Sequence, residues 1–244
     1  MLEIKDLTYE VEDNGTTLTI IDHLNLTIPD GKFVVITGPN GGGKSTLAKL
    51  IMGVNPITSG QILFDGEDMT QKTITERANA GISFAFQQPV HFKGSRVIDL
   101  LRLAAGKEKN LQVAEACDYL SKVGLCAKEY INREVNASLS GGELKRIEIA
   151  TVLARGTKFS IFDEPEAGID LWSFQNLIRV FENIRESING TILIISHQER
   201  ILEIADEIVV IEDGKVKKQG SKEEILPEIL GTSAAVGNCE RLNQ

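Results

Sequence analysis

Apolar and polar residues alternate along the N-terminal part of the chain, up to about residue 35. Leu2, Ile4 and Leu7 begin the alternation, and it resumes around Leu24 after the polar segment Asp13-Asn14-Gly15. A period of two places successive side chains on opposite faces of a strand, and the Asn-Gly pair is typical of a tight turn. This region is therefore predicted to form antiparallel strands joined by turns.

Three later segments are short and mainly apolar, with little alternation: Phe33–Thr37, Phe159–Phe162 and Ile192–Ile195. Strands of this kind are buried on both faces, as in a parallel sheet that helices cover on either side. The segment Ile208–Val216 has the pattern of a hairpin with Asp-Gly in its turn. We expect these segments to form the core of the molecule.

Between about residues 90 and 155 the apolar residues recur with the period of a helix. The residues that fit this period are Val97, Ile98, Leu101 and Leu103, and then Val113, Ala116, Cys117, Leu120 and Val123. The predicted fold is α/β: a mostly parallel core sheet flanked by helices, an N-terminal antiparallel β subdomain, and an inserted helical lobe at roughly residues 88–155. One domain is expected to span residues 1–244.

Composition and charge narrow the functional classes. The formal net charge of −9 argues against non-specific nucleic-acid binding, which requires a basic surface. No apolar run reaches the ~18 residues that span a bilayer, and the first residues lack the pattern of a signal peptide. We therefore predict a cytoplasmic protein with no direct membrane insertion. Three cysteines are too few for a disulfide framework.

A glycine-rich segment follows the first buried strand and precedes a predicted helix from about Lys44 to Met52. Its pattern, G-x-x-x-x-G-K-[ST], is that of a loop whose main-chain N–H groups surround phosphates, helped by the positive end of the helix. The lysine would reach the β- and γ-phosphates, and the following serine would hold Mg²⁺. The predicted nucleotide-binding residues are Gly38, Pro39, Asn40, Gly41, Gly42, Gly43, Lys44, Ser45 and Thr46.

Two adjacent acids, Asp163 and Glu164, end the buried strand at Phe159–Phe162. Beside a phosphate loop, Asp163 would face the metal through its water shell, and Glu164 would polarise the attacking water. Two neighbouring carboxylates require a cation nearby, because like charges raise each other's pKa. In isolation the pair could equally be a solvated acidic turn.

A second candidate phosphate-binding element lies in the helical lobe, where Leu139, Ser140, Gly141, Gly142 and Glu143 begin a helical pattern. On its own this is a capped helix with a Gly-Gly start, and its exposed N–H groups would suit an anion. Here the chain resembles the ABC ATPase family, whose signature is LSGGQ, with Glu143 in place of the usual Gln. The resemblance implies the ABC type of P-loop NTPase fold, with ATP and Mg²⁺ as cofactors.

The resemblance also implies that this signature acts in trans, over the ATP of a second copy in a head-to-tail dimer. Three further positions match the family's order of motifs: Gln87, Asp170 and His197. By resemblance, Gln87 contacts metal or water, Asp170 lies in the D-loop where two subunits meet, and His197 hydrogen-bonds the γ-phosphate. The predicted catalytic residues are thus Glu164, His197 and Gln87, and the predicted metal site is Ser45, Gln87 and Asp163, the last through water.

One position departs from the family. Members usually stack an aromatic residue of the first sheet on adenine, but Val11 stands at the aligned position. Tyr9 is the nearest aromatic residue and lies on the same side of the strand. Either the register differs or the base is held weakly, so the sequence leaves base recognition open.

Within the family, the chain resembles the SufC-type ATPase of the SUF iron–sulfur assembly system. The matching segments are Val11-Glu12-Asp13, the run from Phe84 to Val90, and the run from Ser140 to Arg146. A SufB/SufD-like scaffold is then the implied partner, docking near Gln87 to Gly94. The segment Glu166–Asp170 departs from the Asp-Ser-Gly-Leu-Asp of that subfamily.

Two other functions stay open. A nucleotide-binding subunit of an ABC membrane transporter would carry the same motifs and would pair with a permease. A non-transport regulator of the superfamily usually has two cassettes or a coiled-coil insertion, and this chain shows neither. The sequence thus predicts an ATPase activated by partner-assisted dimerisation, with its partner to be identified.

Overall fold

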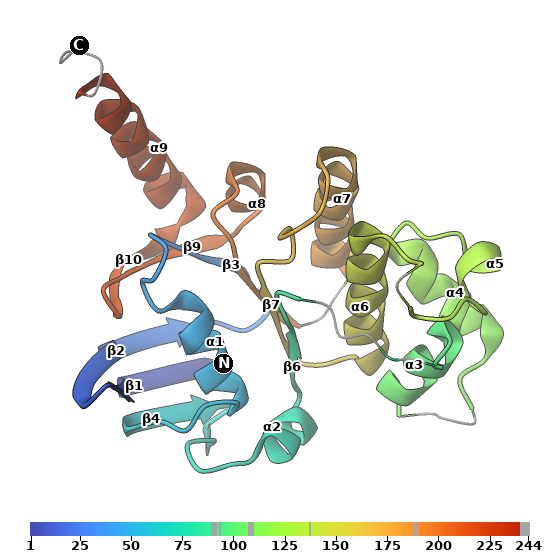
Figure 1. Ribbon diagram of the computed structural model, residues 1–244, viewed down its shortest axis with the longest axis horizontal. Coiled ribbons are helices and arrows are strands. Elements are labelled where there is room, and N and C mark those ends of the chain that lie inside the picture. The colour runs from blue at the N-terminus through green and yellow to red at the C-terminus, as the bar shows by residue number, and fades with distance from the viewer. Residues whose placement is uncertain (89–91, 93, 107–109, 137, 188–189, 240–244) are drawn as a thin grey trace.

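The computed structural model describes residues 1–88, 92, 94–106, 110–136, 138–187 and 190–239, with backbone only at 186–187 and 232–239. Within these residues the strands form two sheets, in the orders β2-β1-β4-β5 and β10-β9-β3-β8-β7-β6 (Figure 1). The strands are β1 (Leu2–Asp13), β2 (Thr16–Ile28), β3 (Phe33–Thr37), β4 (Ser59–Phe64), β5 (Glu67–Asp68), β6 (Ile82–Ala85), β7 (Phe159–Asp163), β8 (Thr191–Ile195), β9 (Glu207–Glu212) and β10 (Lys215–Ser221).

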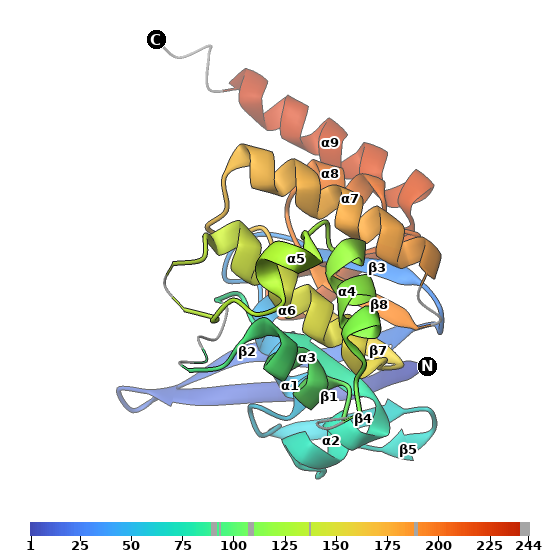
Figure 2. The ribbon, with the colours of Figure 1, turned by 90° about the vertical axis from the view of Figure 1, so that its right-hand side faces the viewer.

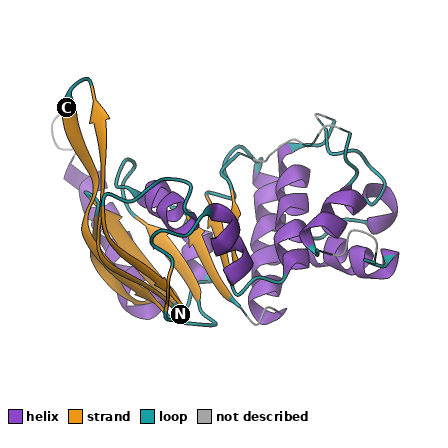
Figure 3. Cartoon of the chain, turned by 90° about the horizontal axis from the view of Figure 1, so that it is seen from below, coloured by secondary structure: helices purple, strands orange, loops and turns teal. Residues whose placement is uncertain are grey.

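Helices cover both sides of the larger sheet and form a separate group at one end of the molecule (Figures 1 and 3). The helices are α1 (Lys44–Met52), α2 (Ile74–Ala80), α3 (Val97–Ala104), α4 (Val113–Lys122), α5 (Ala127–Tyr130), α6 (Gly141–Arg155), α7 (Leu171–Ser187), α8 (Glu199–Glu203) and α9 (Lys222–Cys239).

The larger sheet is parallel from β6 to β9, and only its edge strand β10 runs antiparallel. Its central strands are apolar on both faces because each face packs on a different core. In β3, Phe33 and Val35 belong to the core shared with the helical lobe, whereas Val34 and Ile36 belong to the core shared with α1 and the N-terminal sheet. The predicted α/β architecture with a mostly parallel core sheet is confirmed.

The smaller sheet is antiparallel, as the alternation predicted. Leu2, Ile4 and Leu7 are buried on one face of β1, and the turn at Asn14 and Gly15 has the positive φ angles that Asn-Gly favours. The pairing of β1 with β2 is interrupted by register shifts, one of them between Tyr9 and Glu10. Beside this shift, Ile20 and Ile21 of β2 lie against Gly43 at the start of α1.

The inserted lobe contains α3, α4, α5 and α6, which pack on one another through the predicted apolar stripes. Two residues that fit the helical period are exposed within these helices: Leu103 is 58% exposed and Val113 is 55% exposed. Leu103 lies in the last turn of α3 and Val113 is the first residue of α4, so neither is covered by the neighbouring helices. The bounds of the lobe and the single-domain organisation over residues 1–244 stay predictions.

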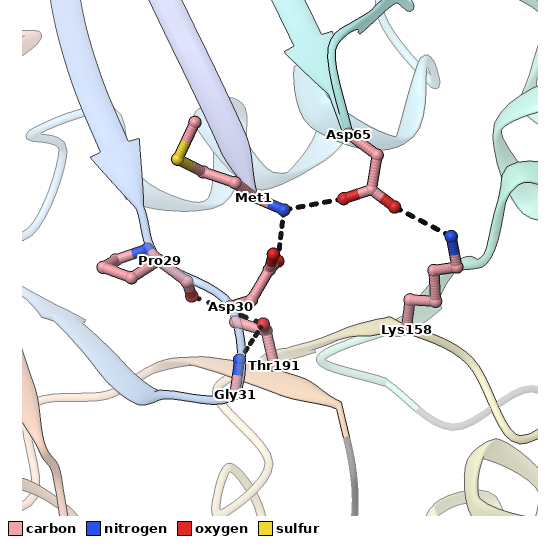
Figure 4. A network of polar contacts seen from close by, with 7 residues as sticks. All are labelled: Met1, Pro29, Asp30, Gly31, Asp65, Lys158 and Thr191. Carbon is pink, nitrogen blue, oxygen red and sulfur yellow. Dashed lines mark hydrogen bonds and ion pairs between the residues drawn. The ribbon is translucent and has the colours of Figure 1, made fainter.

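A network of charges joins the edges of the two sheets near Met1 (Figure 4). The amino group of Met1 contacts Asp30 and lies 2.7 Å from Asp65 Oδ1, while Lys158 Nζ donates to Asp65 Oδ2 at 2.8 Å. The Gly31 N–H donates to Thr191 Oγ1 at 3.0 Å beside it. The bond from Lys158 lowers the pKa of Asp65. The network links the start of β1 to Asp30, which precedes β3, and through Asp65 to Lys158, which precedes β7.

The C-terminal part was only partly predicted. The hairpin of β9 and β10 is present, but the sequence did not indicate that α9 would follow it as a helix to Cys239, despite Pro227 inside it. This helix projects from the body of the molecule (Figures 1 and 2). Of the helices within the described ranges, none combines the length and apolar character needed to cross a bilayer.

Candidate functional site: a phosphate loop with converging carboxylates

The glycine-rich loop runs from the end of β3 into α1, pressed against neighbouring main chain. Gly38 has a φ of 137°, and a Cβ added there would lie 1.9 Å from the carbonyl oxygen of Ile211. At Gly43, with a φ of 99°, an added Cβ would lie 3.0 Å from the carbonyl oxygen of Ile20. Side chains are excluded at both positions, so the main chain alone shapes the loop.

Lys44 lies inside the loop, with its side chain directed at main-chain carbonyls. Its Nζ donates to the carbonyl oxygens of Gly38 at 3.0 Å and Pro39 at 2.9 Å, and the residue is 6% exposed. No carboxylate among the described residues forms an ion pair with it. A buried ammonium without a counter-charge is costly, and an anion bound in the loop would supply that charge.

Ser45 and Asp163 meet at the edge of the core sheet, as the prediction of a shared metal site requires. The Ser45 hydroxyl donates to Asp163 Oδ1 at 2.8 Å, although the two residues come from α1 and β7. Asp163 is 3% exposed; its burial raises the pKa of the carboxyl, and the charge of Glu164 adds to that rise. A hydroxyl and an under-compensated carboxylate side by side are oxygen ligands of the kind that Mg²⁺ prefers.

Glu164 and Gln87 are in direct contact. The Gln87 side-chain amide donates to Glu164 Oε2 at 2.6 Å, bringing together the ends of β6 and β7. Glu164 has a φ of 43°, unusual for a residue other than glycine, and its N–H donates to the carbonyl oxygen of Ile195 at 3.0 Å. The turn after β7 is therefore held in a strained conformation, which commonly marks a functional position.

His197 follows β8 at the same edge of the sheet. Because β7 and β8 are parallel, with Asp163 opposite Ile195, the residues that come next face the same side. The imidazole is exposed, and its Nε2 lies 3.3 Å from the side-chain amide nitrogen of Gln198. The structure thus brings His197 to the edge that carries Asp163 and Glu164, with its ring open to solvent.

The signature segment forms the start of α6, away from the phosphate loop. Ser140 is the N-cap: its hydroxyl accepts from the Glu143 N–H at 3.2 Å, while Glu143 Oε2 accepts from the Ser140 N–H at 2.7 Å. Leu139, just before the cap, is buried. Figure 1 places α6 and α1 on different sides of β6 and β7. Within the described part of the chain, no hydrogen bond connects this segment to the phosphate loop.

The signature packs instead on the D-loop of its own chain. A Cβ added at Gly142 would lie 2.7 Å from Ser173 Oγ, and one at Gly141 would lie 3.3 Å from the Gly168 carbonyl oxygen. Asp170 caps α7 by accepting from the N–H groups of Trp172 at 2.9 Å and Ser173 at 3.0 Å. This local role accounts for an aspartate at position 170, and its contact with a second copy stays a prediction.

The predicted docking region falls partly outside the description. Pro89, Val90, His91 and Lys93 lie beyond the described residues, whereas Gln87, Gln88, Phe92 and Gly94 are within them. An apolar cavity of about 200 Å³ opens beside this segment. Its lining comes from β6, the segment after it, α3, α6 and the strand-like segment before α6: Phe84, Phe86, Phe92, Leu100, Val135, Leu144, Ile147, Glu148, Thr151 and Val152.

Sequence reasoning missed three residues that shape the site. Lys145 is buried in α6, where its Nζ contacts the Phe86 carbonyl oxygen and donates to Glu148 Oε2 at 3.1 Å, so it ties the lobe to the segment before Gln87. A lysine among apolar helix positions was the signal available for it. Glu166 and Ser196 form a buried contact across the two turns of the site, which no local pattern indicates.

Tyr9 and Val11, the two positions considered for contact with the base, both lie in β1. Tyr9 is half-buried and packs on the core beneath the N-terminal sheet, opposite Ile21. Val11 pairs with the exposed Leu18 farther along the same hairpin. Ile21, the partner of Tyr9, lies beside Gly43 of the phosphate loop, and the register shift between Tyr9 and Glu10 separates Val11 from that pair.

Comparison with known proteins agrees with this geometry. The family model described as ABC transporter matches residues 21–167. An uncharacterised ABC transporter ATP-binding protein of Methanocaldococcus jannaschii is 39% identical over 84% of both chains. The iron–sulfur cluster assembly protein SufC of Plasmodium berghei is 36% identical over 91% of this chain and 63% of its own.

Among solved structures, a dimeric ATP-binding cassette in a post-hydrolysis state with ADP and phosphate superposes with a TM-score of 0.80. It is 22% identical, and the match covers 91% of this chain and 99% of the other. At that identity the likeness establishes the shared fold.

Proposed function

The chain belongs to the ABC transporter family, whose cassettes are ATPases that use ATP with Mg²⁺, and from that premise we propose that it drives an iron–sulfur cluster assembly scaffold. Its partner would be a SufB/SufD-like protein, and its own ATP-dependent dimer would supply the movement. The observation that carries the proposal is the 36% identity with the Plasmodium SufC protein over 91% of this chain. The contact of Gln87 with Glu164 beside an apolar cavity would give a docked partner a route to the site.

The residues around the phosphate loop fit Mg²⁺ and ATP. Lys44 lacks a counter-charge that the β- and γ-phosphates would provide, and the main-chain N–H groups of residues 38–46 would hold the rest. Ser45 and Gln87 would hold Mg²⁺, with Asp163 acting through water; the ion neutralises charge on the phosphates when bound. Glu164 would orient and deprotonate water, and His197 would donate to the γ-phosphate.

A single copy lacks the donors that complete this site. The start of α6 lies away from the chain's own phosphate loop, which precedes α1 (Figure 1). In a head-to-tail pair, residues 139–143 of one copy would reach the γ-phosphate bound by the other. Donors aimed at developing charge commonly contribute more to catalysis than any other effect, so hydrolysis should be slow until pairing occurs.

Partner binding would act on the site through Gln87. Phe86 is next to it and lines the docking cavity, and Lys145 connects the Phe86 carbonyl to α6. An apolar side chain of the partner that fills the cavity would shift Gln87. Glu164 would move with it, because the Gln87 amide donates to Glu164 Oε2 at 2.6 Å. Docking and chemistry would then be linked by two contiguous residues, a link that either partner class could use.

A transporter subunit is the alternative, and the name of the Methanocaldococcus relative favours it. The deciding experiment is purification of the tagged full chain from its native cells, followed by identification of the co-purified proteins. Recovery of a soluble SufB/SufD-like scaffold supports the proposal, whereas recovery of a multi-span permease supports the alternative and overturns it.

Matched surface variants make the purification specific. Phe92 is half-exposed at the cavity, so Phe92→Glu should abolish recovery of the partner without unfolding the chain. Val113→Glu introduces the same charge at an exposed apolar position away from the cavity and should leave recovery intact. Equal recovery with both variants would place the docking surface elsewhere.

A further inference from the structure

Glu166 is a buried acid in the turn that leaves β7. The residue is 9% exposed, and its Oε1 accepts a hydrogen bond from the hydroxyl of Ser196, which is fully buried. Its Oε2 is also buried and has no partner among the described residues. A half-satisfied carboxyl in a protein interior is costly and calls for a physical reason.

The contact joins the two turns that carry the proposed catalytic groups. Glu166 lies two residues after Glu164, and Ser196 immediately precedes His197. The Ser196 hydroxyl also accepts from the Gln198 N–H at 3.0 Å, so one oxygen fixes both ends of the turn that contains His197. Glu166 in turn anchors that oxygen to the other turn.

The main chain holds the start of each turn to a neighbouring strand. The Glu164 N–H donates to the carbonyl oxygen of Ile195 at 3.0 Å, and the Ser196 N–H donates to that of Ile36 at 3.1 Å. The Ser196–Glu166 bond is the side-chain contact that joins the two turns to each other. Burial raises the pKa of Glu166, which means that the protein interior disfavours its charged form. The Ser196–Glu166 bond directly connects the residue before His197 to the turn that carries Glu164.

We propose that Glu166 is a positioning residue, which acts through Ser196 to hold the turn of His197 in register with Glu164. The inference rests on the proposed roles of those two residues. Glu166 itself touches neither phosphate nor water in this scheme. Because the same turn continues to Asp170, a shift of the D-loop on pairing would reach His197 by this route.

The first test compares variants that remove or keep the bond, in the purified full chain at saturating ATP. Ser196→Ala and Glu166→Ala should lower kcat at least about tenfold with the KM for ATP within about twofold, since positioning affects the reaction more than binding. Glu166→Gln keeps an acceptor of the same size and should retain most of the activity. A parental kcat in Ser196→Ala overturns the inference.

A double-mutant cycle separates positioning from general loss of structure. If Ser196 acts through His197, then Ser196→Ala should cause no further loss of kcat in a His197→Ala chain. Additive losses would refute the role of Glu166 and Ser196 while leaving the proposed function intact. A parental kcat in His197→Ala would instead refute the proposed role of His197, and the inference with it. Ser196→Ala removes one oxygen, so it remains informative if Glu166→Ala does not fold.

Discussion

Asp163→Asn should make the chain more stable and inactive. The carboxyl is almost fully buried and accepts one hydrogen bond, from Ser45, which the amide oxygen of asparagine can also accept. Burial raises its pKa above the ordinary 3.8, so in the folded chain the charged form is disfavoured. Loss of that charge removes a cost, whereas loss of the metal-facing carboxylate removes the chemistry.

The direction in which the stability change depends on pH follows from the linkage between proton binding and folding. A carboxyl whose pKa is raised on folding binds protons more tightly in the native state, so its destabilising effect appears as pH rises above 3.8 and is complete above the folded pKa. The variant should therefore gain stability at pH 8 and lose that gain towards pH 4. Removal of one such strained site typically adds about 0.5–2 kcal/mol. For a chain of this size that is a rise of about 1–8 °C in Tm.

The assay is thermal unfolding without nucleotide at pH 8 and pH 5, in parallel with ATP hydrolysis. Asp213→Asn is the matched control, because the Asp213 side chain is exposed and its φ of 50° suits asparagine equally well. The control should change neither Tm nor activity. A lower Tm for Asp163→Asn at pH 8 would refute the reasoning, because the buried charge would then be stabilising.

Three further outcomes are expected. Lys44→Ala should reduce ATP affinity by at least about a hundredfold in equilibrium titration, since charge-assisted bonds to two phosphates contribute several kcal/mol; unchanged affinity would remove the phosphate-loop assignment. Gly142→Ala should leave the ATP affinity of the monomer intact but abolish ATP-dependent pairing in light scattering, because the new Cβ displaces Ser173 from Asp170. Trp172 is the sole tryptophan and is 76% exposed beside Asp170. Its fluorescence emission should shift to the blue when two Glu164→Gln chains pair in the presence of ATP. An unchanged emission spectrum in the paired state would exclude Trp172 from the interface.

Local patterns predicted the parts of the fold that depend on neighbours in sequence. The strand Phe33–Thr37 and the helix Lys44–Met52 have the bounds expected from the apolar run and the glycine-rich turn. The helical period does not by itself give burial, which depends on tertiary packing: Leu103 and Val113 fit the period but are exposed at helix ends. The helix after Ser221 was missed because its apolar residues are interrupted by Pro227 and glycine.

In the candidate site, too, the local motifs could be predicted from the sequence, whereas the contacts between distant residues could not. Its motifs were found from sequence because phosphate binding requires particular residues at fixed spacing, as with Lys44 and Ser45. The contact of Gln87 with Glu164 joins residues 77 positions apart, so no local pattern could show it. The same holds for Glu166 and Ser196, which are 30 positions apart and meet because β7 and β8 are adjacent.

Subunit mixing tests the central claim most directly, that one copy completes the ATP site of the other. Lys44→Ala disables the phosphate loop and Gly142→Ala disables the signature, so each variant alone should be inactive. In a mixed pair, the intact loop of one chain faces the intact signature of the other. Neither variant should pair with itself, so only mixed dimers form, and one intact site of two in each should restore up to about half of the parental activity. A mixture no more active than its separate components would contradict the account.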